Sequence, residues 1–577
     1  MGIPRLISTL EPYVVHQVLD NKSVVIDGPA LAYHVLYICI RHGIPQPSYE
    51  ILGKTAVAWL DELTRRSVIV DAIYFDGYLP PDKAPVRMHR MIESFNQLKK
   101  TQSAETSGFF PTYFTTPFEP SPTLFSAARP PLGKRAIPPS FHVPAVIDAL
   151  RSSPRYACLV CLVPGEADAY CAQHLSQSGG TVLTSDSDLL VHDLGEGDVV
   201  FIRDIYLDQQ SRLACASFNP THICEKLKLA SSAEICRFAY ERKSSPHSTL
   251  PQLLQDCTRP LADLIGYAEF CQEYQDHAVA PIPVSVYGTP IRIDSLDPRI
   301  SEMVLQLGHT GVQMDTTDDP KMFLPILLES PERGSAWEQS TSIRQLAYTI
   351  ARWAITGTSS VVQEYRRVNT TAQKGRQVPM LPEKAAKALV RDITRLMSTI
   401  RLATGSDTIR AWHLIYLTLD IRHCYEEGRS SHMLQTIESS LQKPLPKRVS
   451  WDTIHFVAQL QAAYYSFRLL KQVLSLGQPA EVLPELRDML SLLPPLTECP
   501  DIDKTLEFLQ PTSSTGVYEI IATSVPLPNV DDSAKRKRKD QNKNKKRKVT
   551  NQDLPKTKAR VTKPGTRNMF DVLSHES

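Results

Sequence analysis

The chain has 577 residues, of which 42% are apolar and 22% are charged, with 64 Lys and Arg against 62 Asp and Glu. This composition is that of a globular protein, and it excludes a collagen, a disordered chain and a small disulfide scaffold. At roughly 150 residues per domain, the length predicts about three or four domains. The net charge of +2 is unevenly placed: residues 533–577 hold 15 Lys and Arg and 4 Asp and Glu, a net +11, which leaves −9 for residues 1–532.

The chain shows no signal for a membrane or for secretion. No apolar run reaches the roughly 18 to 20 residues that a membrane span needs, and the N-terminal segment lacks the basic and then apolar pattern of a signal peptide. The 11 cysteines are scattered and odd in number, which is typical of a reducing compartment. We therefore expect a soluble intracellular protein with no membrane partner.

Short apolar runs alternate with helical stretches over residues 1–215, which is the pattern of βαβ units. The expected strands are apolar on both faces, as in a sheet covered by helices on both sides. They are SVVID (23–27), VDAIYFD (70–76), ACLVCLV (157–163), GTVLTSD (180–186) and DVVFIRD (198–204). This part predicts an α/β fold with a mainly parallel sheet flanked by helices.

The rest of the chain divides by composition. A Pro-rich insertion at 101–143 interrupts the alternation, residues 216–330 form a mixed connecting region, and residues 331–510 have the period of an all-α C-terminal domain. Residues 511–577 are expected to be a disordered basic tail. For the aromatic residues of the insertion, stacking on bases and packing against the body are alternatives; these are Phe109, Phe110, Tyr113 and Phe114, with Lys134 and Arg135 beyond them as contacts for phosphates.

Six carboxylates follow predicted strands directly. They are Asp27, Asp76, Glu166 with Asp168, and Asp186 with Asp188. Because the carboxyl ends of parallel strands line one crevice, we expect these side chains to lie close together. For any single one of them, capping the following helix is an equal alternative, since Asp is a favoured N-cap.

Six neighbouring carboxylates cannot all stay ionised without cations. Mg²⁺ and Mn²⁺ prefer oxygen ligands of this kind, and two such ions can activate a water and stabilise the leaving oxygen in phosphodiester cleavage. The pattern therefore predicts a site for one or two Mg²⁺ or Mn²⁺ ions. A small-molecule phosphohydrolase is disfavoured because the sequence contains no phosphate-cradling Gly-rich loop.

Five motifs stand in an order known from one family. MGIPRL, VVIDGPALAY, YFDG followed by Lys83 and Arg90, VPGEADAYCA and TSDSDLLV resemble the flap endonuclease/XPG family of the PIN-like nuclease superfamily. With a helical domain behind the XPG-like part, the chain more narrowly resembles an Asteroid family protein. The resemblance covers about residues 1–215, and the helical half matches only loosely.

The resemblance implies roles for individual residues. Asp27, Asp76, Glu166 and Asp168 match the family's first metal site, and Asp186 with Asp188 matches part of the second. Lys83 and Arg90 match the catalytic basic pair that faces the scissile phosphate, Gly2 the N-terminal glycine near the active site, and Tyr33 a position where an aromatic ring stacks on a base. From the residues alone, Lys83 and Arg90 also fit a solvated helix face, and Tyr33 also fits the core.

Beyond Asp188 the chain departs from the pattern of this family. The family continues into a glycine-rich helix-two-turn-helix that binds duplex and supplies one more acidic ligand, whereas LKLASSAEICRFAYERKSSPHS stands here. Arg242 falls near the expected acid, and Glu241 is the candidate to replace it. This departure argues against a complete second metal site and against standard duplex binding.

Two basic runs in the tail predict recognition by a nuclear import receptor and hence a nuclear protein. They are Lys535, Arg536, Lys537, Arg538 and Lys539, and Lys545, Lys546, Arg547 and Lys548. The same cations suit salt-dependent, sequence-independent binding to nucleic acid.

Two functions from different classes stay open. The first is a structure-selective, divalent-metal-dependent nuclease that hydrolyses phosphodiester bonds in branched or single-stranded DNA or RNA. The second is an Asteroid-like binding or scaffold protein that keeps the nuclease fold, has weak or no catalysis, and docks a protein partner on its helical domain. The six acids favour the first, since a scaffold has no need of a repulsive cluster, while the missing duplex-binding motif and the acidic body favour the second.

Overall fold

The computed structural model describes residues 2–510, apart from 117–118, 120–121, 126–136, 230–233, 276–278, 310–318, 356–358, 443–446 and 477–482. All of the described residues belong to one compact unit, Met1–Ser524. The expected basic tail, with its two runs of Lys and Arg, lies outside the described residues.

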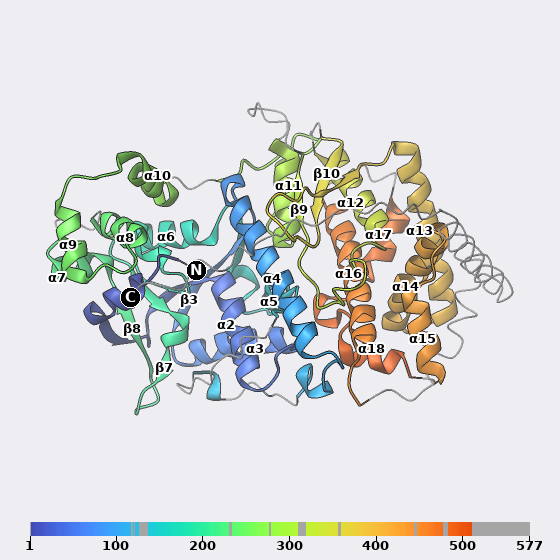
Figure 1. The fold of residues 1–577 in the computed structure, drawn as a ribbon, viewed down its shortest axis with the longest axis horizontal. Helices are drawn as coiled ribbons and strands as arrows, with labels where there is room; N and C mark the ends of the chain where they lie inside the picture. Colours follow the sequence, from blue (N-terminus) through green and yellow to red (C-terminus); the bar gives the residue numbers. More distant parts are fainter. Residues whose placement is uncertain are drawn as a thin grey trace, which may run out of the picture. The chain divides into compact units, whose positions relative to one another are not determined.

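An eight-stranded sheet forms the centre of the N-terminal part (Figure 1). The strand order is β1-β8-β6-β5-β2-β3-β4, and β7 pairs with β8. The bounds are β1 Val15–Val18, β2 Ser23–Asp27, β3 Ile69–Asp76, β4 Val160–Val163, β5 Thr181–Thr184, β6 Asp198–Phe201, β7 Tyr206–Leu207 and β8 Leu213–Phe218. The run from β6 to β4 is parallel, while β8 is antiparallel to β1, β6 and β7. The predicted mainly parallel sheet is confirmed.

The central strands are buried on both faces, as their unbroken apolar sequences predict. Val24, Val25 and Ile26 of β2 are each at most 1% exposed, and every residue of β5 is buried. All five predicted strands form, and β2 has the predicted bounds. The β5 strand is shorter than its prediction, because it ends at Thr184 and leaves Asp186 in the following turn.

Helices cover both faces of this sheet (Figure 1). Helices α2 (Gly28–Arg41), α3 (Tyr49–Arg65) and α5 (His142–Ser152) pack against one another on one face. Helix α6 (Ala167–Ser178) packs on β2, β3 and β5 from the other face, where Leu175 and Val25 share one apolar cluster. Alternate residues of a strand point to opposite faces, so β2 packs against α2 on one face of the sheet and against α6 on the other.

The mixed region at 216–330 is mostly helical where it is described. It contains α7 (Pro220–Leu227), α8 (Glu234–Ser244), α9 (Leu250–Thr258), α10 (Leu264–Gln275), α11 (Pro298–His309) and the strand β9 (Lys321–Phe323). Ile223, Phe238, Leu253 and Phe270 from α7 to α10 join the same apolar cluster as α6. These four helices therefore extend the core on the α6 side of the sheet.

The C-terminal part is helical, as predicted. Its helices are α12 (Thr341–Ala354), α13 (Glu383–Thr404), α14 (Thr408–Glu426), α15 (His432–Gln442), α16 (Trp451–Val473), α17 (Pro484–Ser491) and α18 (Ile502–Phe508). Helix α16 is buried around nearly its whole circumference and contacts α12, α14, α15 and α17. Sequence reasoning missed the hairpin of β10 (Val361–Tyr365) and β11 (Arg376–Pro379), which joins β9 in a small three-stranded sheet.

The start of the Pro-rich insertion is part of the core. Helix α4 (Ala84–Ala104) runs into the insertion, and Phe109 and Phe114 behind it are each 5% exposed in one cluster with Trp451. Tyr113 stacks on Phe109 with ring centroids 4.2 Å apart. For these three aromatics, packing against the body is confirmed and base stacking is wrong, while Phe110 is 54% exposed. Lys134 and Arg135 lie outside the described residues.

Two expectations about the compartment have structural counterparts. Across residues 2–510, gaps excepted, no helix is long and apolar enough to cross a membrane. All 11 cysteines are free thiols, and Cys158, which the apolar run around it would place in the core, is exposed.

Candidate active site

Asp27 is both the last residue of β2 and the N-cap of α2. Its Oδ1 accepts a hydrogen bond from the Ala30 N–H at 3.1 Å, and its Oδ2 accepts one from the Thr184 hydroxyl at 2.7 Å. Burial, with the charges of Asp76 and Asp186, raises the pKa of Asp27 to about 7, although the two hydrogen bonds oppose the rise. The capping role is therefore real for this residue, but the carboxyl also faces the acids of the neighbouring strands.

Asp168 lies at the electrostatic centre of the acidic residues. Burial raises its pKa well above the usual range, and so do the charges of Asp27, Asp186, Asp76 and Glu166. Asp76, at the end of β3, accepts a hydrogen bond from the Ala167 N–H at 2.7 Å, and burial raises its pKa to about 6. Because α6 begins at Ala167, Asp168 is helical while Glu166 is the extended N-cap of that helix, so the two side chains do not project together as two residues of one strand would.

Lys83 is the cation among these acids. It ends the short 3-10 helix Pro81–Lys83, and its Nζ lies 3.0 Å from Oε1 and 2.9 Å from Oε2 of Glu166. Burial opposes its charge, but Glu166 and Glu273 outweigh burial, and the pKa of Lys83 is raised. Lys83 is thus held charged beside the acids.

The second acidic pair lies against the N-terminal segment. Asp186 Oδ1 accepts a hydrogen bond from the Asp188 N–H at 3.1 Å, and Asp188 Oδ1 accepts one from the Ile3 N–H at 3.0 Å. Gly2 has φ +89°, and a Cβ on it would lie 2.7 Å from Asp186 Oδ1. Burial, with the charges of Asp186 and Glu273, raises the pKa of Asp188 to about 6. Only a glycine fits this close approach.

Burial and the charges of neighbouring acids raise the pKa values of four of the six carboxyl groups, but the six do not converge on one position where an ion could be held. In the part of the chain that the structure describes, no three Asp, Glu, His or Cys side chains are arranged to hold a metal ion. Asp27, Asp76, Glu166 and Asp188 are instead turned toward protein donors. Carboxylate oxygens gathered in this way are the kind of ligand that suits a hard divalent ion.

The structure separates the predicted basic pair. Lys83 lies among the carboxylates, whereas Arg90 is exposed two turns further along α4, within electrostatic reach of Tyr33. Tyr33 is 53% exposed, so its alternative placement in the core is wrong. Arg87, which sequence reasoning did not consider, acts on Asp76 and lies 2.6 Å from Glu302 of α11.

The acid expected from α8 is engaged elsewhere. Glu241 pairs with Arg237 at 2.6 Å, and Arg242 is buried, donating to the Ser248 carbonyl and the Thr9 hydroxyl. Glu273 of α10 is instead the acid near Lys83 and Asp188. Thr184 opens the motif TSDSDLLV, but its hydrogen bond to Asp27 could not be read from the motif. Glu273 stands in no motif, so only the fold reveals that it adjoins the site.

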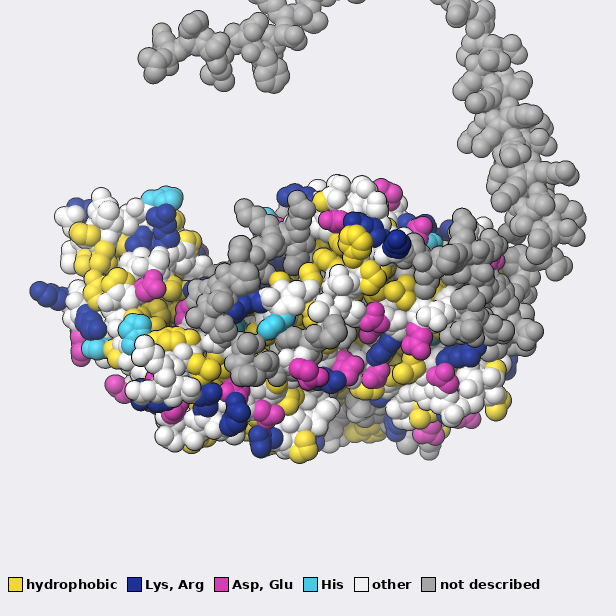
Figure 2. All heavy atoms as spheres, turned by 90° about the horizontal axis from the view of Figure 1, so that it is seen from below, with side chains coloured by type: hydrophobic (Ala, Val, Ile, Leu, Met, Phe, Trp, Pro, Cys, Tyr) yellow, Lys and Arg dark blue, Asp and Glu magenta, His cyan; other side chains and the backbone are white. Residues whose placement is uncertain are grey.

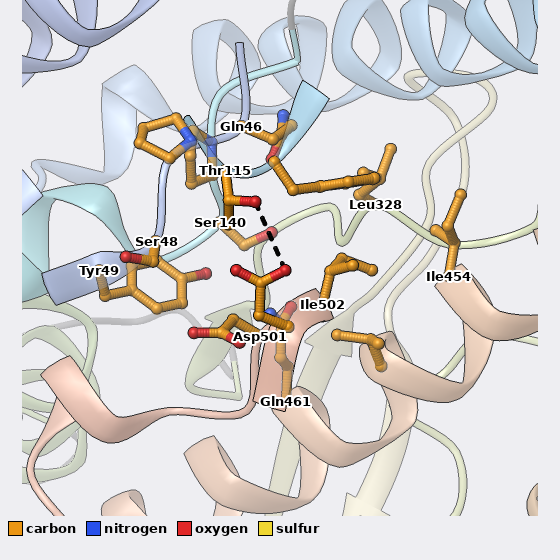
Figure 3. Close-up of a pocket in the computed structure, with 15 residues that line it drawn as sticks. Gln46, Ser48, Tyr49, Thr115, Ser140, Leu328, Ile454, Gln461, Asp501 and Ile502 are labelled. Atoms are coloured by element: carbon orange, nitrogen blue, oxygen red, sulfur yellow. Dashed lines mark hydrogen bonds between the residues drawn. The ribbon is translucent and has the colours of Figure 1, made fainter. Parts of the chain in front are cut away.

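Three hollows among the described residues have none of the six acids in their lining. A groove of about 600 Å³ runs from Gly2 and Ser187 past Arg5 and Tyr206, so it opens beside the second acidic pair. A cavity of about 50 Å³ is lined by Tyr49, Thr115, Asp501 and other residues (Figure 3). Its volume suits a few waters rather than a substrate.

Part of the chain resembles known proteins. Residues 138–379 match the family model described as "XPG domain containing". The chain is 26% identical over 201 residues to Asteroid homolog 1 of Schizosaccharomyces pombe (strain 972 / ATCC 24843), a match that covers 34% of this chain and 31% of that protein.

Solved structures of Rad2 also align with the chain. The catalytic core of Rad2 in complex with DNA substrate aligns at 11% identity and a TM-score of 0.25, over 48% of this chain and 89% of that one. A second structure of the Rad2 catalytic core aligns at 15% identity and a TM-score of 0.23, over 53% and 95%.

The mainly parallel sheet and the match of residues 138–379 show an α/β fold that resembles the XPG domain. More narrowly, the match to Asteroid homolog 1 confirms the predicted resemblance to Asteroid proteins, over about a third of that relative's length.

Proposed function

We propose that the chain is a divalent-metal-dependent nuclease that hydrolyses phosphodiester bonds in branched or single-stranded nucleic acid. The observation that carries this proposal is the gathering of six carboxylates and Lys83 at the carboxyl ends of parallel strands in an XPG-like fold. Four of the six carboxyls have raised pKa values, first because they are buried and second because the charges of neighbouring acids add to the effect of burial. Bound divalent cations would neutralise these carboxylates and attract the anionic phosphate of a substrate.

The residues have distinct roles in this proposal. Asp27, Asp76, Glu166, Asp168, Asp186 and Asp188 would hold one or two Mg²⁺ or Mn²⁺ ions, which when bound supply Lewis acidity and an activated water. Lys83 would hold an oxygen of the scissile phosphate. Tyr33 and Arg90, exposed side by side, would contact a base and a phosphate of the flanking strand.

A nuclease-fold binding protein with weak or no catalysis is the second candidate. Two observations favour it: Glu241 is paired with Arg237 and does not replace the missing acid, and the described carboxylates do not converge on one ion position. In this case the helical part would serve a protein partner, and the crevice would bind nucleic acid without cutting it.

The deciding experiment is cleavage of labelled 5′-flap, nicked and single-stranded DNA and RNA in Mn²⁺ or Mg²⁺. We expect cleavage by the wild-type protein, none in EDTA, and a loss of roughly a hundredfold or more for the double variant Asp186→Asn, Asp188→Asn, since it removes charge from the ion site. Asp392→Asn is the matched control, because Asp392 pairs with Arg422 in the helical part. Wild-type protein that cleaves no substrate better than the double variant would leave only the binding function.

We also propose that the basic tail directs the protein to the nucleus through an import receptor. The two runs of Lys and Arg between residues 535 and 548 support this proposal.

A further inference from the structure

A carboxylate lies between two lysines at the edge of the acidic crevice. Glu273, near the end of α10, has its Oε1 3.8 Å from Lys83 Nζ and its Oε2 3.5 Å from Lys243 Nζ. Lys83 precedes α4 and Lys243 belongs to α8, so three elements that are distant in sequence meet at one carboxylate. Because one carboxylate bridges two ammonium groups here, the space between the two lysines is suited to binding an anion.

The two lysines adjoin both halves of the acidic group. Lys83 is bonded to Glu166, beside the first four acids, while the charge of Lys243 acts on Asp188 of the second pair. The centroid of the Phe270 ring lies 4.8 Å from Lys243 Nζ, and Phe270 is 4% exposed. A buried ring therefore makes a cation–π contact with this lysine. Lys243 is thus positioned by the core rather than free on a surface.

The bridging contacts are easy to exchange. The side chains of Lys83, Glu273 and Lys243 are 29%, 35% and 50% exposed, and ion pairs this long and this exposed are weak. Helix α10 itself is anchored, since Tyr274 is buried and Cys271 Sγ lies 3.2 Å from Cys236 Sγ of α8. Rotation of the Glu273 side chain alone therefore opens the position.

We propose that Lys83 and Lys243 form a phosphate-binding pair for the backbone of a nucleic acid, and that Glu273 is a built-in anion that competes for the same position. The inference rests on the proposed function for the identity of the ligand. A phosphodiester group carries the charge of the carboxylate and offers equivalent oxygens, so it replaces Glu273 between the two ammonium groups. Binding then requires the displacement of Glu273, which favours ligands that make further contacts elsewhere in the crevice.

The test is fluorescence anisotropy of labelled single-stranded and flap oligonucleotides in EDTA, where no cleavage occurs. We expect Glu273→Gln to bind roughly threefold to tenfold more tightly than wild type, and Lys243→Gln to bind more weakly by a similar factor. For single strands, Lys243→Gln should also lower the slope of log Kd against log salt by about 0.7, the loss of one phosphate contact. In the double variant, the gain from Glu273→Gln should fall below about twofold, because the competed contact is gone.

The matched control is the exposed pair Glu50 and Lys54 of α3, whose side chains lie 2.8 Å apart. Glu50→Gln and Lys54→Gln should leave affinity and salt slope unchanged. A Glu273→Gln protein that binds no more tightly than wild type overturns the inference, as does a gain that persists in full without Lys243.

Failure of the proposed function looks different. Wild-type protein that binds in EDTA but never cleaves in metal contradicts the nuclease proposal and leaves the lysine pair standing. Cleavage by wild type without any gain in Glu273→Gln contradicts the lysine pair alone. If neither wild type nor Glu273→Gln binds any oligonucleotide, both are wrong.

Discussion

At Gly2, the addition of a single Cβ atom would disturb the residues around Asp186 and Asp188. A Cβ at this position would overlap the Ser187 hydroxyl and lie 2.7 Å from Asp186 Oδ1, in a backbone with φ +89°. We expect Gly2→Ala to push the N-terminal segment away from Asp188 and to lower the cleavage rate roughly tenfold or more, since misplacement of a site by about 1 Å costs up to a hundredfold. Steady-state cleavage of a flap substrate measures this effect.

Gly43 provides the control for backbone strain. It has nearly the same φ, +85°, but no atom lies within 4 Å of a Cβ built on it. Gly43→Ala therefore carries the strain, about 1 kcal/mol, without the clash, and should cleave at the wild-type rate. Equal loss of activity in both variants would mean that strain, and not contact with the acidic pair, explains the effect.

The six acids were predictable at this scale because each belongs to a strand end, and strand ends share one edge of a parallel sheet. Thr184, Glu273 and Lys243 were not predictable in the same way. Thr184 reads as an ordinary strand residue, and Glu273 is one of two acids in α10. The places of Glu273 and Lys243 depend on long-range packing of α8 and α10, and that of Thr184 on the pairing of β5 with β2, which no local spacing encodes.

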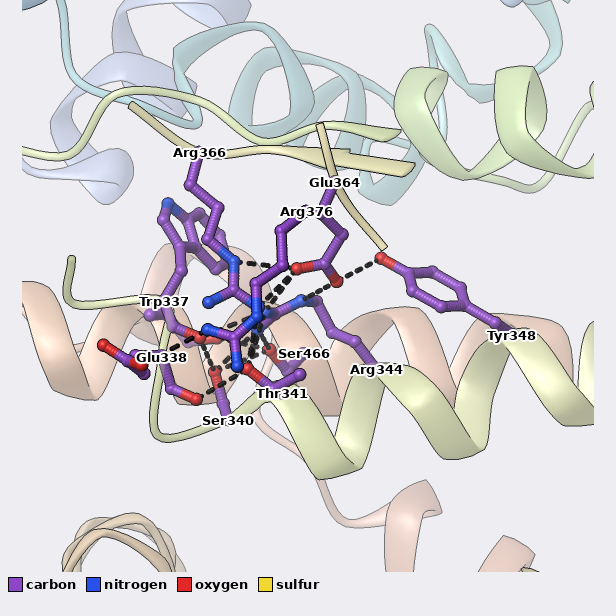
Figure 4. A network of polar contacts seen from close by, with 11 residues as sticks. Trp337, Glu338, Ser340, Thr341, Arg344, Tyr348, Glu364, Arg366, Arg376 and Ser466 are labelled. Carbon is purple, nitrogen blue, oxygen red and sulfur yellow. Dashed lines mark hydrogen bonds and ion pairs between the residues drawn. The ribbon is translucent and has the colours of Figure 1, made fainter. Parts of the chain in front are cut away.

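At the scale of secondary-structure elements, a buried ion network joins β10 to two helices (Figure 4). Glu364 of β10 accepts from Arg344 Nε of α12 at 2.7 Å and from Arg366 Nη2 at 2.6 Å, and Arg344 also donates to Ser466 of α16 at 3.0 Å. Both Arg344 and Glu364 are at most 1% exposed. The hairpin that sequence reasoning missed is therefore fixed by charges, which is why its strands lack an apolar pattern.

We expect Glu364→Gln to destabilise the protein by about 3–5 kcal/mol, because two buried guanidinium groups lose their counter-charge. Urea unfolding followed by tryptophan fluorescence measures this change. Glu383→Gln, which removes one partner of an exposed pair with Lys387, should change stability by less than about 1 kcal/mol. If Glu364→Gln lowers the free energy of unfolding no more than Glu383→Gln does, the buried ion network does not stabilise the fold.

The same network predicts a pH dependence. Burial opposes the charge of Glu364, but Arg344 and Arg366 outweigh it, and the pKa of Glu364 falls from 4.5 to about 2. Since the folded pKa is depressed, this stabilisation is complete above about pH 4.5 and is lost as the pH falls toward about 2. Glu364→Gln should therefore show a shallower acid destabilisation over this range than wild type.

At the scale of the whole molecule, charge is divided between body and tail. Residues 1–532 carry −9 and residues 533–577 carry +11. On the face shown in Figure 2, Lys and Arg side chains lie interspersed with Asp and Glu, without a continuous basic stripe among the coloured residues. A body of this kind offers little long-range attraction to nucleic acid, whereas the local cations Lys83 and Lys243 act only at contact distance.

We therefore expect the tail to supply the electrostatic attraction and the crevice to supply the selectivity. Replacing the nine Lys and Arg of residues 535–539 and 545–548 with Gln keeps the chain length, removes nine positive charges and should weaken binding to any oligonucleotide at low salt, with a much shallower salt slope. Cleavage of a flap at saturating substrate should stay unchanged, because none of these residues is among those proposed to hold the ions or the scissile phosphate. In cells, a fluorescent fusion of this variant should lose its nuclear accumulation. A variant that still accumulates in the nucleus and keeps the wild-type salt slope would contradict both roles, and would transfer the attraction to cations of the folded body.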